Sequence, residues 1–311
     1  MTRSQNSNPA LFISVDARFE AHWEQFQNSL ERNWPDYPEV LVALHDRGGA
    51  FEEKLRATHR YRLLEPDVFC LPHGPVMAHL EGKVNAEPFY SRLALWGDSF
   101  AEYDTILHLD VDTIVLGSLD ELVITSDFQI AVDLYQGDNY LFNNHSCAEL
   151  NRLLWEDGLA IPTQQANAGV FTMPRKYRSR ECLHEMKLLL ARYRNHLRWA
   201  DQSLINIWML KHGLAVSQDL AWNFQARAFA QQIVDIDQVK VLHFNGVPDP
   251  QRVSLMKAAN RLSQYRGGWH WLRKTLRDLP NLKAHDLGSM VEQTWPSMRQ
   301  DRGQGTMKDA A

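Results

Sequence analysis

The most informative part of the sequence is TILHLDVDTIVLGS, residues 105–118. A short apolar segment, Ile106 to Leu109, runs directly into two aspartates, Asp110 and Asp112, and further apolar residues follow. The first segment is short and continuous enough to predict a buried strand. In open α/β sheets, ligands bind beyond the carboxyl ends of the strands, so the two aspartates are candidate ligand-binding residues.

Upstream of this segment, the sequence predicts a strand, a helix and a second strand. Leu11 to Val15 is apolar and ends at Asp16, and Val40 to Leu44 is a second apolar run. Between them, Phe19 to Arg32 carries apolar residues at helical spacing before Pro35 breaks the chain. A βαβ unit of this kind predicts a parallel sheet with helices on both faces.

Further along, the same patterns predict three more helices and three more strands. The predicted helices are Phe89 to Phe100, Cys182 to Tyr193 and Ser203 to Leu210, and the strands are Ile130 to Val132, Gly169 to Met173 and Val239 to Leu242. Residues 50–84 show no clear pattern. We therefore expect an α/β domain over residues 1–250, with a mostly parallel central sheet flanked by helices. Residues 251–311 form a basic, Trp-containing helical tail in this prediction.

The bulk composition excludes several classes of protein. The 311 residues carry a net charge of −5, which gives no basic field for nucleic acid. Three cysteines, Cys70, Cys147 and Cys182, form neither a disulfide framework nor a C-x-x-C zinc pair, as expected of a reducing compartment. No apolar run approaches the roughly 20 residues of a membrane-spanning helix. The sequence therefore predicts a cytoplasmic enzyme, with a peripheral position at the inner face of the membrane as an option.

Polar residues stand at the ends of four predicted strands, and two of them are close enough to suggest a metal. The residues are Asp16, the Asp110/Asp112 pair, Asp133 and His243. Two like charges one residue apart repel unless a cation or a shared proton compensates. Carboxylates suit Mg²⁺ or Mn²⁺, and one imidazole favours Mn²⁺. A turn with capping aspartates is the alternative for the pair, and a structural histidine is the alternative for His243.

A second D-x-D, formed by Asp235 and Asp237, serves as an internal comparison. No clean apolar strand leads into it, and glutamines surround it. We interpret it as a solvated turn without a metal role.

Four segments, taken in order, resemble glycosyltransferase family 8, the group that contains glycogenin and bacterial lipopolysaccharide galactosyltransferases. Residues 89–122 resemble the central signature of that family, and residues 167–170 resemble its N-[AS]-G-V element. Residues 199–203 are similar to its D-Q element, and residues 241–246 to its H-[FY]-x-G element. The motifs span roughly residues 11 to 247 of this chain, which makes their order more specific than any one of them.

The resemblance implies a GT-A fold and a retaining transfer from a nucleotide-diphosphate sugar, with uridine as the base. It implies Mn²⁺ (or Mg²⁺) held by Asp110, Asp112 and His243. The acceptor would be a glycan, a lipopolysaccharide or another lipid-linked molecule.

Roles for further residues follow from the same resemblance. Residues assigned to the donor are Asp16, Arg92, Asp110, Asn167, Ala168 and Gly246, and residues assigned to the reacting sugar are Asp133, Asp201 and Gln202. A helix-surface arginine is the alternative for Arg92, and a helix N-cap is the alternative for Asp201.

One departure from the family pattern concerns the diphosphate. The family commonly continues H-x-x-G-x-x-K-P-W, but this chain has Asp249 where lysine is expected and Gln251 where tryptophan is expected. Either Arg252 or Lys257 supplies the missing charge, or the loop points elsewhere. A non-catalytic module that binds a nucleotide sugar is therefore one alternative function.

Two further alternatives remain open. One is a sugar nucleotidyltransferase. Such an enzyme needs a Gly-rich loop after the first strand, and the absence of glycine from residues 16–19 counts against it. The basic residues between 252 and 283, with Trp269 and Trp271 among them, are compatible with contact with anionic lipid. A solvated helix that packs on the domain is the alternative for this segment.

Overall fold

The fold is known from a computed structural model of the chain. It describes residues 7–69, 90–133, 148–160, 164–197, 200–216, 219–226, 238–247 and 249–263. Cys70, Cys147, Asp235, Asp237, Trp269 and Trp271 lie outside these ranges, as do residues 264–283 of the predicted membrane-contacting segment.

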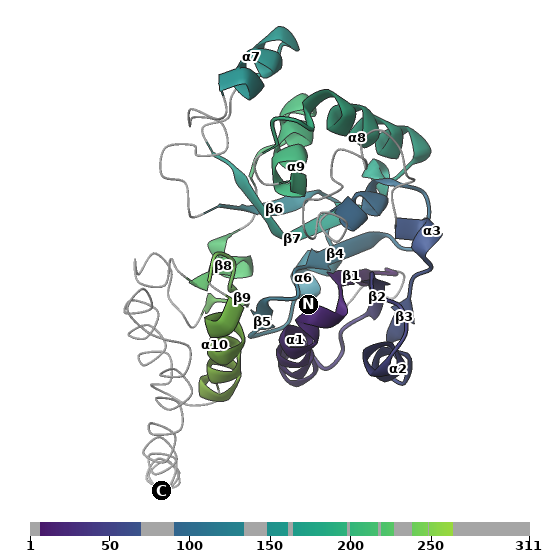
Figure 1. The fold of residues 1–311 in the computed structure, drawn as a ribbon, viewed down its shortest axis with the longest axis vertical. Helices are drawn as coiled ribbons and strands as arrows, with labels where there is room; N and C mark the ends of the chain where they lie inside the picture. Colours follow the sequence, from purple (N-terminus) through teal and green to yellow (C-terminus); the bar gives the residue numbers. More distant parts are fainter. Residues whose placement is uncertain are drawn as a thin grey trace, which may run out of the picture.

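A six-stranded sheet forms the centre of the described structure (Figure 1). Its order is β3-β2-β1-β4-β7-β6, and β7 alone runs antiparallel to its neighbours. The predicted mostly parallel sheet is therefore confirmed. The strands are β1 (Ala10–Val15), β2 (Glu39–Leu44), β3 (Tyr61–Leu63), β4 (Thr105–Leu109), β6 (Gln129–Val132) and β7 (Ala166–Pro174).

Both faces of this sheet are buried, which explains the unbroken apolar runs of its strands. Successive side chains of β1 alternate between two cores, because neighbouring residues of a strand point to opposite faces. Ala10 and Phe12 join one core, while Leu11, Ile13 and Val15 join the other.

Different helices cover the two faces. One face carries α1 (Glu20–Asn33), α2 (Ala50–Arg56) and α6 (Asp120–Val123). The other carries α7 (Ala148–Glu156), α8 (Arg180–Tyr193), α9 (Ala200–Lys211) and a 3₁₀ helix, Arg92–Trp96. Figure 1 shows α8 and α9 on one side of the sheet and α1 and α2 on the other. The short α3 (Pro66–Phe69) lies at the end of β3.

A second, smaller sheet lies beside the first. It has the order β5-β9-β8, with β5 (Thr113–Val115), β9 (Val241–His243) and β8 (Phe224–Gln225). α10 (Asp249–Leu262) packs against this sheet through a third core that includes Leu242, Leu255 and Met256. α10 also meets α1, where Asn260 donates to the carbonyl of Gln25 at 2.8 Å.

α1 holds the outer edge of β5 through two side chains. The backbone N–H of Val115 donates to Ser29 Oγ at 3.0 Å, and Asn33 donates to the carbonyl of Val115 at 2.7 Å. These two contacts satisfy backbone groups that would otherwise be unpaired, so the strand following the two aspartates has a defined position.

The predicted helix from Phe89 to Phe100 is confirmed only in part, because helical structure ends at Trp96. Tyr90 and Ser91 are α-helical and continue into the 3₁₀ helix Arg92–Trp96, which ends at Gly97 with an extended backbone, and turns follow. The side chains of all five residues in this helix are buried, so tertiary packing outweighs the helical periodicity. The strand β3 was not predicted, because one buried and two half-buried residues carry too little pattern. No helix among the described residues is both long and apolar enough to cross a bilayer.

Asn206 ties α9 to the start of β7. Its side chain accepts from the N–H of Ala166 at 2.8 Å and donates to the carbonyl of the same residue at 2.9 Å. Asn206 is buried. We expect Asn206→Leu to lower the free energy of unfolding by about 2–4 kcal/mol, because it leaves two buried backbone groups unpaired. Urea denaturation followed by circular dichroism measures this, and an unchanged midpoint would contradict it.

Candidate active site

Backbone pairing places the two aspartates. Asp110 directly follows β4, and its N–H donates to the carbonyl of Gly169 in β7 at 2.8 Å. Asp112 directly precedes β5. The carboxylates are therefore held at the carboxyl end of a central strand, as the sequence predicted.

The small sheet brings His243 to the same point. In the β5–β9 pair, Thr113 lies opposite His243, and the N–H of Phe244 donates to the carbonyl of Asp112 at 2.9 Å. The imidazole Nε2 consequently lies 3.2 Å from Asp112 Oδ1 and 3.7 Å from Asp110 Oδ2. One ligand atom from each of the three residues lies within 4.8 Å of the others, so the group could hold a metal ion.

A series of hydrogen bonds fixes the tautomer of His243. The N–H of Gly169 donates to the side chain of Asn167 at 3.0 Å, so the accepting atom is the Asn167 oxygen. Asn223 donates to that same oxygen at 2.9 Å, and its own oxygen must then face His243. That oxygen lies 2.9 Å from Nδ1, so Nδ1 carries the hydrogen.

This tautomer leaves Nε2 of the neutral ring with its lone pair directed at the two aspartates. His243 is buried, and Nε2 makes no well-aligned hydrogen bond despite its nearness to Asp112. A lone pair that faces carboxylates is unfavourable unless a proton or a metal lies between them. The donor set and its orientation therefore fit a divalent metal.

Gly169 lets the His243 ring lie directly against the backbone of β7. A Cβ on Gly169 would lie 2.1 Å from Cε1 of His243 and 2.6 Å from Nδ1. Atoms cannot approach this closely, so any larger residue at position 169 has to displace the ring. Gly169, the glycine of the predicted N-[AS]-G-V element, therefore leaves the space that the His243 ring occupies.

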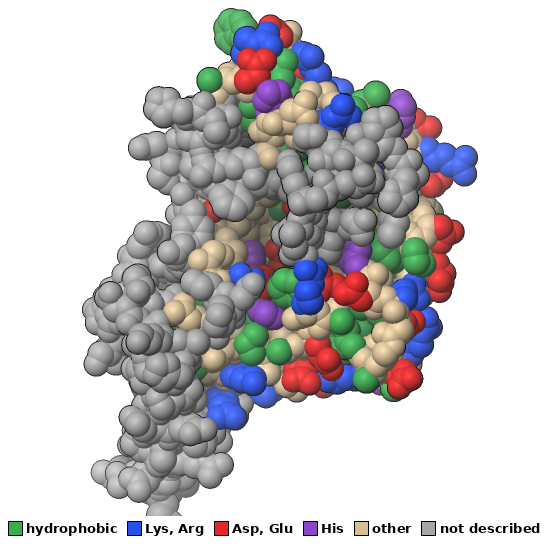
Figure 2. Space-filling model, viewed as in Figure 1, with side chains coloured by type: hydrophobic (Ala, Val, Ile, Leu, Met, Phe, Trp, Pro, Cys, Tyr) green, Lys and Arg blue, Asp and Glu red, His purple; other side chains and the backbone are tan. Residues whose placement is uncertain are grey.

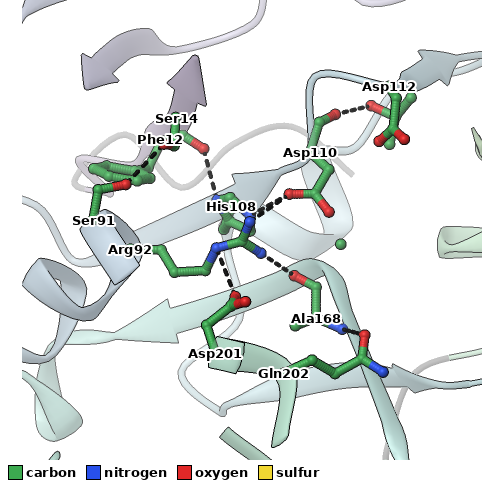
Figure 3. Close-up of polar contacts among 12 residues, drawn as sticks. Phe12, Ser14, Ser91, Arg92, His108, Asp110, Asp112, Ala168, Asp201 and Gln202 are labelled. Carbon is green, nitrogen blue, oxygen red and sulfur yellow. Dashed lines mark hydrogen bonds and ion pairs between the residues drawn. The ribbon is translucent and has the colours of Figure 1, made fainter. Parts of the chain in front are cut away.

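Arg92 lies at the centre of the site (Figure 3). It donates to Asp110 Oδ1 at 2.9 Å and to the carbonyl of Ala168 at 3.1 Å, and its Nε lies 2.9 Å from Asp201 Oδ2. Only 6% of its side chain is exposed, so the alternative of a helix-surface arginine is wrong. Its role as a donor contact stays a prediction.

The charges of the site are set by competition between burial and neighbouring ions. Burial favours a raised pKa for Asp110, but the positive charge of Arg92 outweighs it and the pKa of Asp110 is lowered. In Asp201, burial prevails over Arg92, and the pKa is raised to about 6. Burial favours a lowered pKa for His243, yet Asp112 and Asp110 outweigh it and the pKa is raised. A divalent metal bound by these residues would take the place of that proton.

A line of amide contacts leads from Asp110, Asp112 and His243, the candidate metal-binding group, to the other predicted residues. Gln202 accepts from the N–H of Ala168 at 3.2 Å and from Asn167 Nδ2 at 3.3 Å, and it donates to Asp133 at 2.8 Å. The structure therefore brings the predicted residues Asp133, Asn167 and Gln202 together. α9 begins at Ala200, so Asp201 lies in its first turn rather than at its N-cap.

Asp16 and Gly246 lie apart from this line of contacts. Asp16 follows β1, is buried and pairs with Arg18 at 2.5 Å. Gly246 follows β9 with a φ of 66°, which favours glycine. Their roles as donor contacts stay predictions, and nothing is described of the side chain of Asp249.

Three residues of the site had no assigned place in it from the sequence. His108 is buried, with Nε2 3.2 Å from Asp110 Oδ1, and its spacing of two residues from Asp110 was an available signal. Asn223 carried no recognisable signal. Arg252 donates to Asp112 Oδ2 at 3.0 Å, although the sequence had suggested it only as a substitute cation.

The group formed by Asp110, Asp112 and His243 is partly exposed. Figure 2 shows a hollow in one face of the molecule, and acidic and histidine side chains gather in it. The side chain of Asp110 is 26% exposed, whereas those of Asp112 and His243 are 11% and 2% exposed. A ligand can therefore reach the group through Asp110.

We expect Asn223→Leu to weaken Mn²⁺ binding about 10- to 100-fold, because the His243 ring loses the acceptor that orients it. Asn223→Asp keeps an acceptor for Nδ1 and should lose less. Isothermal titration with Mn²⁺ measures both affinities. Wild-type affinity in Asn223→Leu would show that the ring is oriented without this contact.

We expect Gly169→Ala to weaken Mn²⁺ binding by at least about 10-fold, since the new methyl group displaces His243. Gly117→Ala is the matched control, because its added Cβ meets only the flexible side chain of Lys240, at 3.1 Å. Titration of both variants with Mn²⁺ separates the effect of His243 from that of a lost glycine. Equal affinities in the two variants would contradict the expectation.

Comparisons with known proteins agree with this geometry. Residues 77–250 match the sequence model of a family described as Glycosyl transferase family 8. No curated protein sequence matches the chain.

Three solved structures are similar to the chain in fold. The galactosyltransferase LgtC, in complex with donor and acceptor sugar analogues, is 20% identical with a TM-score of 0.55, and the alignment covers 87% of this chain and 94% of LgtC. The bifunctional glycosyltransferase WbbM is 15% identical with a TM-score of 0.57, over 81% of this chain and 48% of WbbM. GlyE from Streptococcus pneumoniae TIGR4 is 16% identical with a TM-score of 0.55, over 94% of this chain and 64% of GlyE. At these identities the likeness shows a shared fold, and the predicted GT-A type fold is confirmed.

Proposed function

The chain belongs to glycosyltransferase family 8, and from that premise we propose that it transfers a sugar from a nucleotide-diphosphate donor, with retention of anomeric configuration. The donor is a UDP-sugar, and the acceptor is a glycan, a lipopolysaccharide or another lipid-linked molecule. The cofactor is Mn²⁺, or Mg²⁺ in its place.

The observation that carries the proposal is the convergence of Asp110, Asp112 and His243. They come from two sheets, and their ligand atoms lie within 4.8 Å of one another. Carboxylates and an imidazole are ligands that Mn²⁺ accepts, and the remaining coordination positions suit diphosphate oxygens. A site of this kind suits a substrate whose phosphate oxygens complete the coordination of the metal.

The chemistry requires negative charge to be stabilised on the leaving nucleotide. A bound divalent metal would stabilise the charge that develops on the diphosphate when the bond to the anomeric carbon breaks. Asp110, Asp112 and His243 would hold that metal. Arg92 keeps Asp110 ionised and in place through its 2.9 Å contact, which supports the same role.

The sugar would lie against the second group of residues. Asp133 and Gln202 are joined at 2.8 Å, and Gln202 is held in turn by Ala168 and Asn167. A side chain restrained from several directions positions a substrate more accurately than a free one. We assign Asp133, Asp201 and Gln202 to the reacting sugar, and Asn167, Ala168, Asp16 and Gly246 to the donor.

The cellular location of the protein bears on the identity of its acceptor. Contact of residues 252–283 with the inner face of the membrane would bring a lipid-linked acceptor to a cytoplasmic enzyme. In the described part of this segment, Leu255 and Met256 are buried on the domain, while Lys257 is exposed. Sedimentation with anionic liposomes, compared between the full chain and a chain that ends at residue 263, tests whether the residues after 263 bind the membrane.

We expect Asp112→Asn to reduce Mn²⁺-dependent transfer or donor hydrolysis by at least about 100-fold, because the metal loses a charged ligand. A panel of UDP-sugars with and without Mn²⁺ provides the assay, and circular dichroism confirms the fold. Asp127→Asn is the matched control, since Asp127 is exposed and pairs with Lys176 at the surface.

A variant Asp112→Asn as active as the wild type would refute the metal assignment. Binding of UDP and Mn²⁺ without turnover of any donor would instead favour the non-catalytic module. A nucleotidyltransferase would be indicated by activity with a nucleoside triphosphate and a sugar phosphate.

A further inference from the structure

Arg252 reaches the metal-binding group from a separate element, the first turn of α10. Its Nη1 donates to Asp112 Oδ2 at 3.0 Å, while Nε and Nη2 donate to the carbonyl of Val247 at 3.1 and 2.9 Å. The two contacts with Val247 orient the plane of the guanidinium, and the third directs it at the carboxylate. Arg252 therefore connects the loop after β9, through Val247, to Asp112.

The two oxygens of Asp112 have different neighbours. Oδ1 lies 3.2 Å from Nε2 of His243, and Oδ2 lies 3.0 Å from Arg252. A metal held by Asp112 and His243 would therefore share the Asp112 carboxylate with a fixed positive charge. Two cations on one carboxylate repel each other, so Arg252 opposes metal binding when no anion is present.

A diphosphate reverses this effect. Its negative oxygens, placed on the metal, would meet the guanidinium as well, and a planar guanidinium matches phosphate oxygens with two parallel hydrogen bonds. Repulsion between the two cations is then replaced by attraction of both to the same anion. Metal and nucleotide would each bind more tightly in the presence of the other.

Arg92, the other arginine paired with these aspartates in the described structure, is less suited to this role. Its side chain is 6% exposed, and Asp110, Asp201 and the carbonyl of Ala168 surround it. Arg252 is more exposed, at 18%, and its printed contacts are with Asp112 and the carbonyl of Val247. The exposed Lys257, on the same helix, has no described contact with the aspartates.

We propose that Arg252 is the diphosphate-binding cation of this chain and that its pairing with Asp112 makes metal binding depend on the nucleotide. The proposal rests on the proposed function and adds the residue that couples the two ligands. Asp249, which replaces the lysine expected by resemblance, is then compatible with a working site. It stands at the start of α10, where an acidic residue suits the helix dipole.

The test uses the full chain and measures two affinities with opposite expected changes. Mn²⁺ affinity without nucleotide is measured from the electron paramagnetic resonance signal of free Mn²⁺. UDP affinity at saturating Mn²⁺ is measured by isothermal titration. We expect R252Q to tighten Mn²⁺ binding about 3- to 10-fold and to weaken UDP binding about 10- to 100-fold.

Two further variants complete the design. K257Q removes the same charge from the exposed face of α10, and we expect both of its affinities to equal those of the wild type. R252K keeps the charge and loses the planar fork, so we expect near wild-type Mn²⁺ affinity and UDP binding weakened about 3- to 10-fold. R252K carries the test if R252Q does not fold.

The outcomes separate this proposal from the proposed function. Loss of both affinities in R252Q, or of neither, would overturn the coupling role of Arg252, as would loss of UDP affinity in K257Q alone. Wild-type UDP affinity in a folded R252K would overturn the assignment of the guanidinium fork. Failure of the wild-type protein to bind UDP with Mn²⁺ would instead overturn the proposed function itself.

Discussion

The pairing of β5 with β9 is the constraint on which the site depends. These two strands hold three residues each, and they belong to the small sheet rather than to the central one. Their register sets His243 opposite Thr113 and therefore beside Asp112. A shift of one residue would turn the histidine to the other face of its sheet, because side chains alternate along a strand. The anchoring of β5 by Ser29 and Asn33 of α1 supports that register from the far side.

Hydrogen-bonded amide groups connect the two parts of the site. Asn167 and Gly169 in β7, Asn223 before β8 and Gln202 in α9 are joined by hydrogen bonds whose directions follow from two backbone N–H groups. Because backbone donors cannot reverse, each amide and the His243 tautomer are fixed. The two arginines then set the charge: Arg92 pairs with Asp110, and Arg252 pairs with Asp112. The repulsion between the aspartates that first suggested a metal is therefore partly compensated by the protein itself.

The sequence predicted the central sheet well, since its strands are continuous apolar runs that are buried on both faces. β1, β2, β4 and β7 all lie where the pattern placed them, with ends displaced by a few residues. The segment from Phe89 to Phe100 followed its apolar spacing only in part: residues 90–96 are helical, but Arg92–Trp96 form a 3₁₀ helix with all five residues buried, and the helix ends at Gly97. β3 escaped prediction because its partner, β2, rather than its own composition, holds it in place.

The sequence by itself determined the family and the residues of the candidate metal-binding group: two carboxylates after a buried strand and a distant histidine in a recognisable element. Only the tertiary structure decided which side chains surround them. Asn223 and Arg252 are an amide and a cation without a distinctive local pattern, and their contacts join residues 20 and 140 positions apart. Contacts of that range depend on how two sheets and α10 pack together. Periodicity along the chain carries no information about such packing, because it reports only which face of each element is buried.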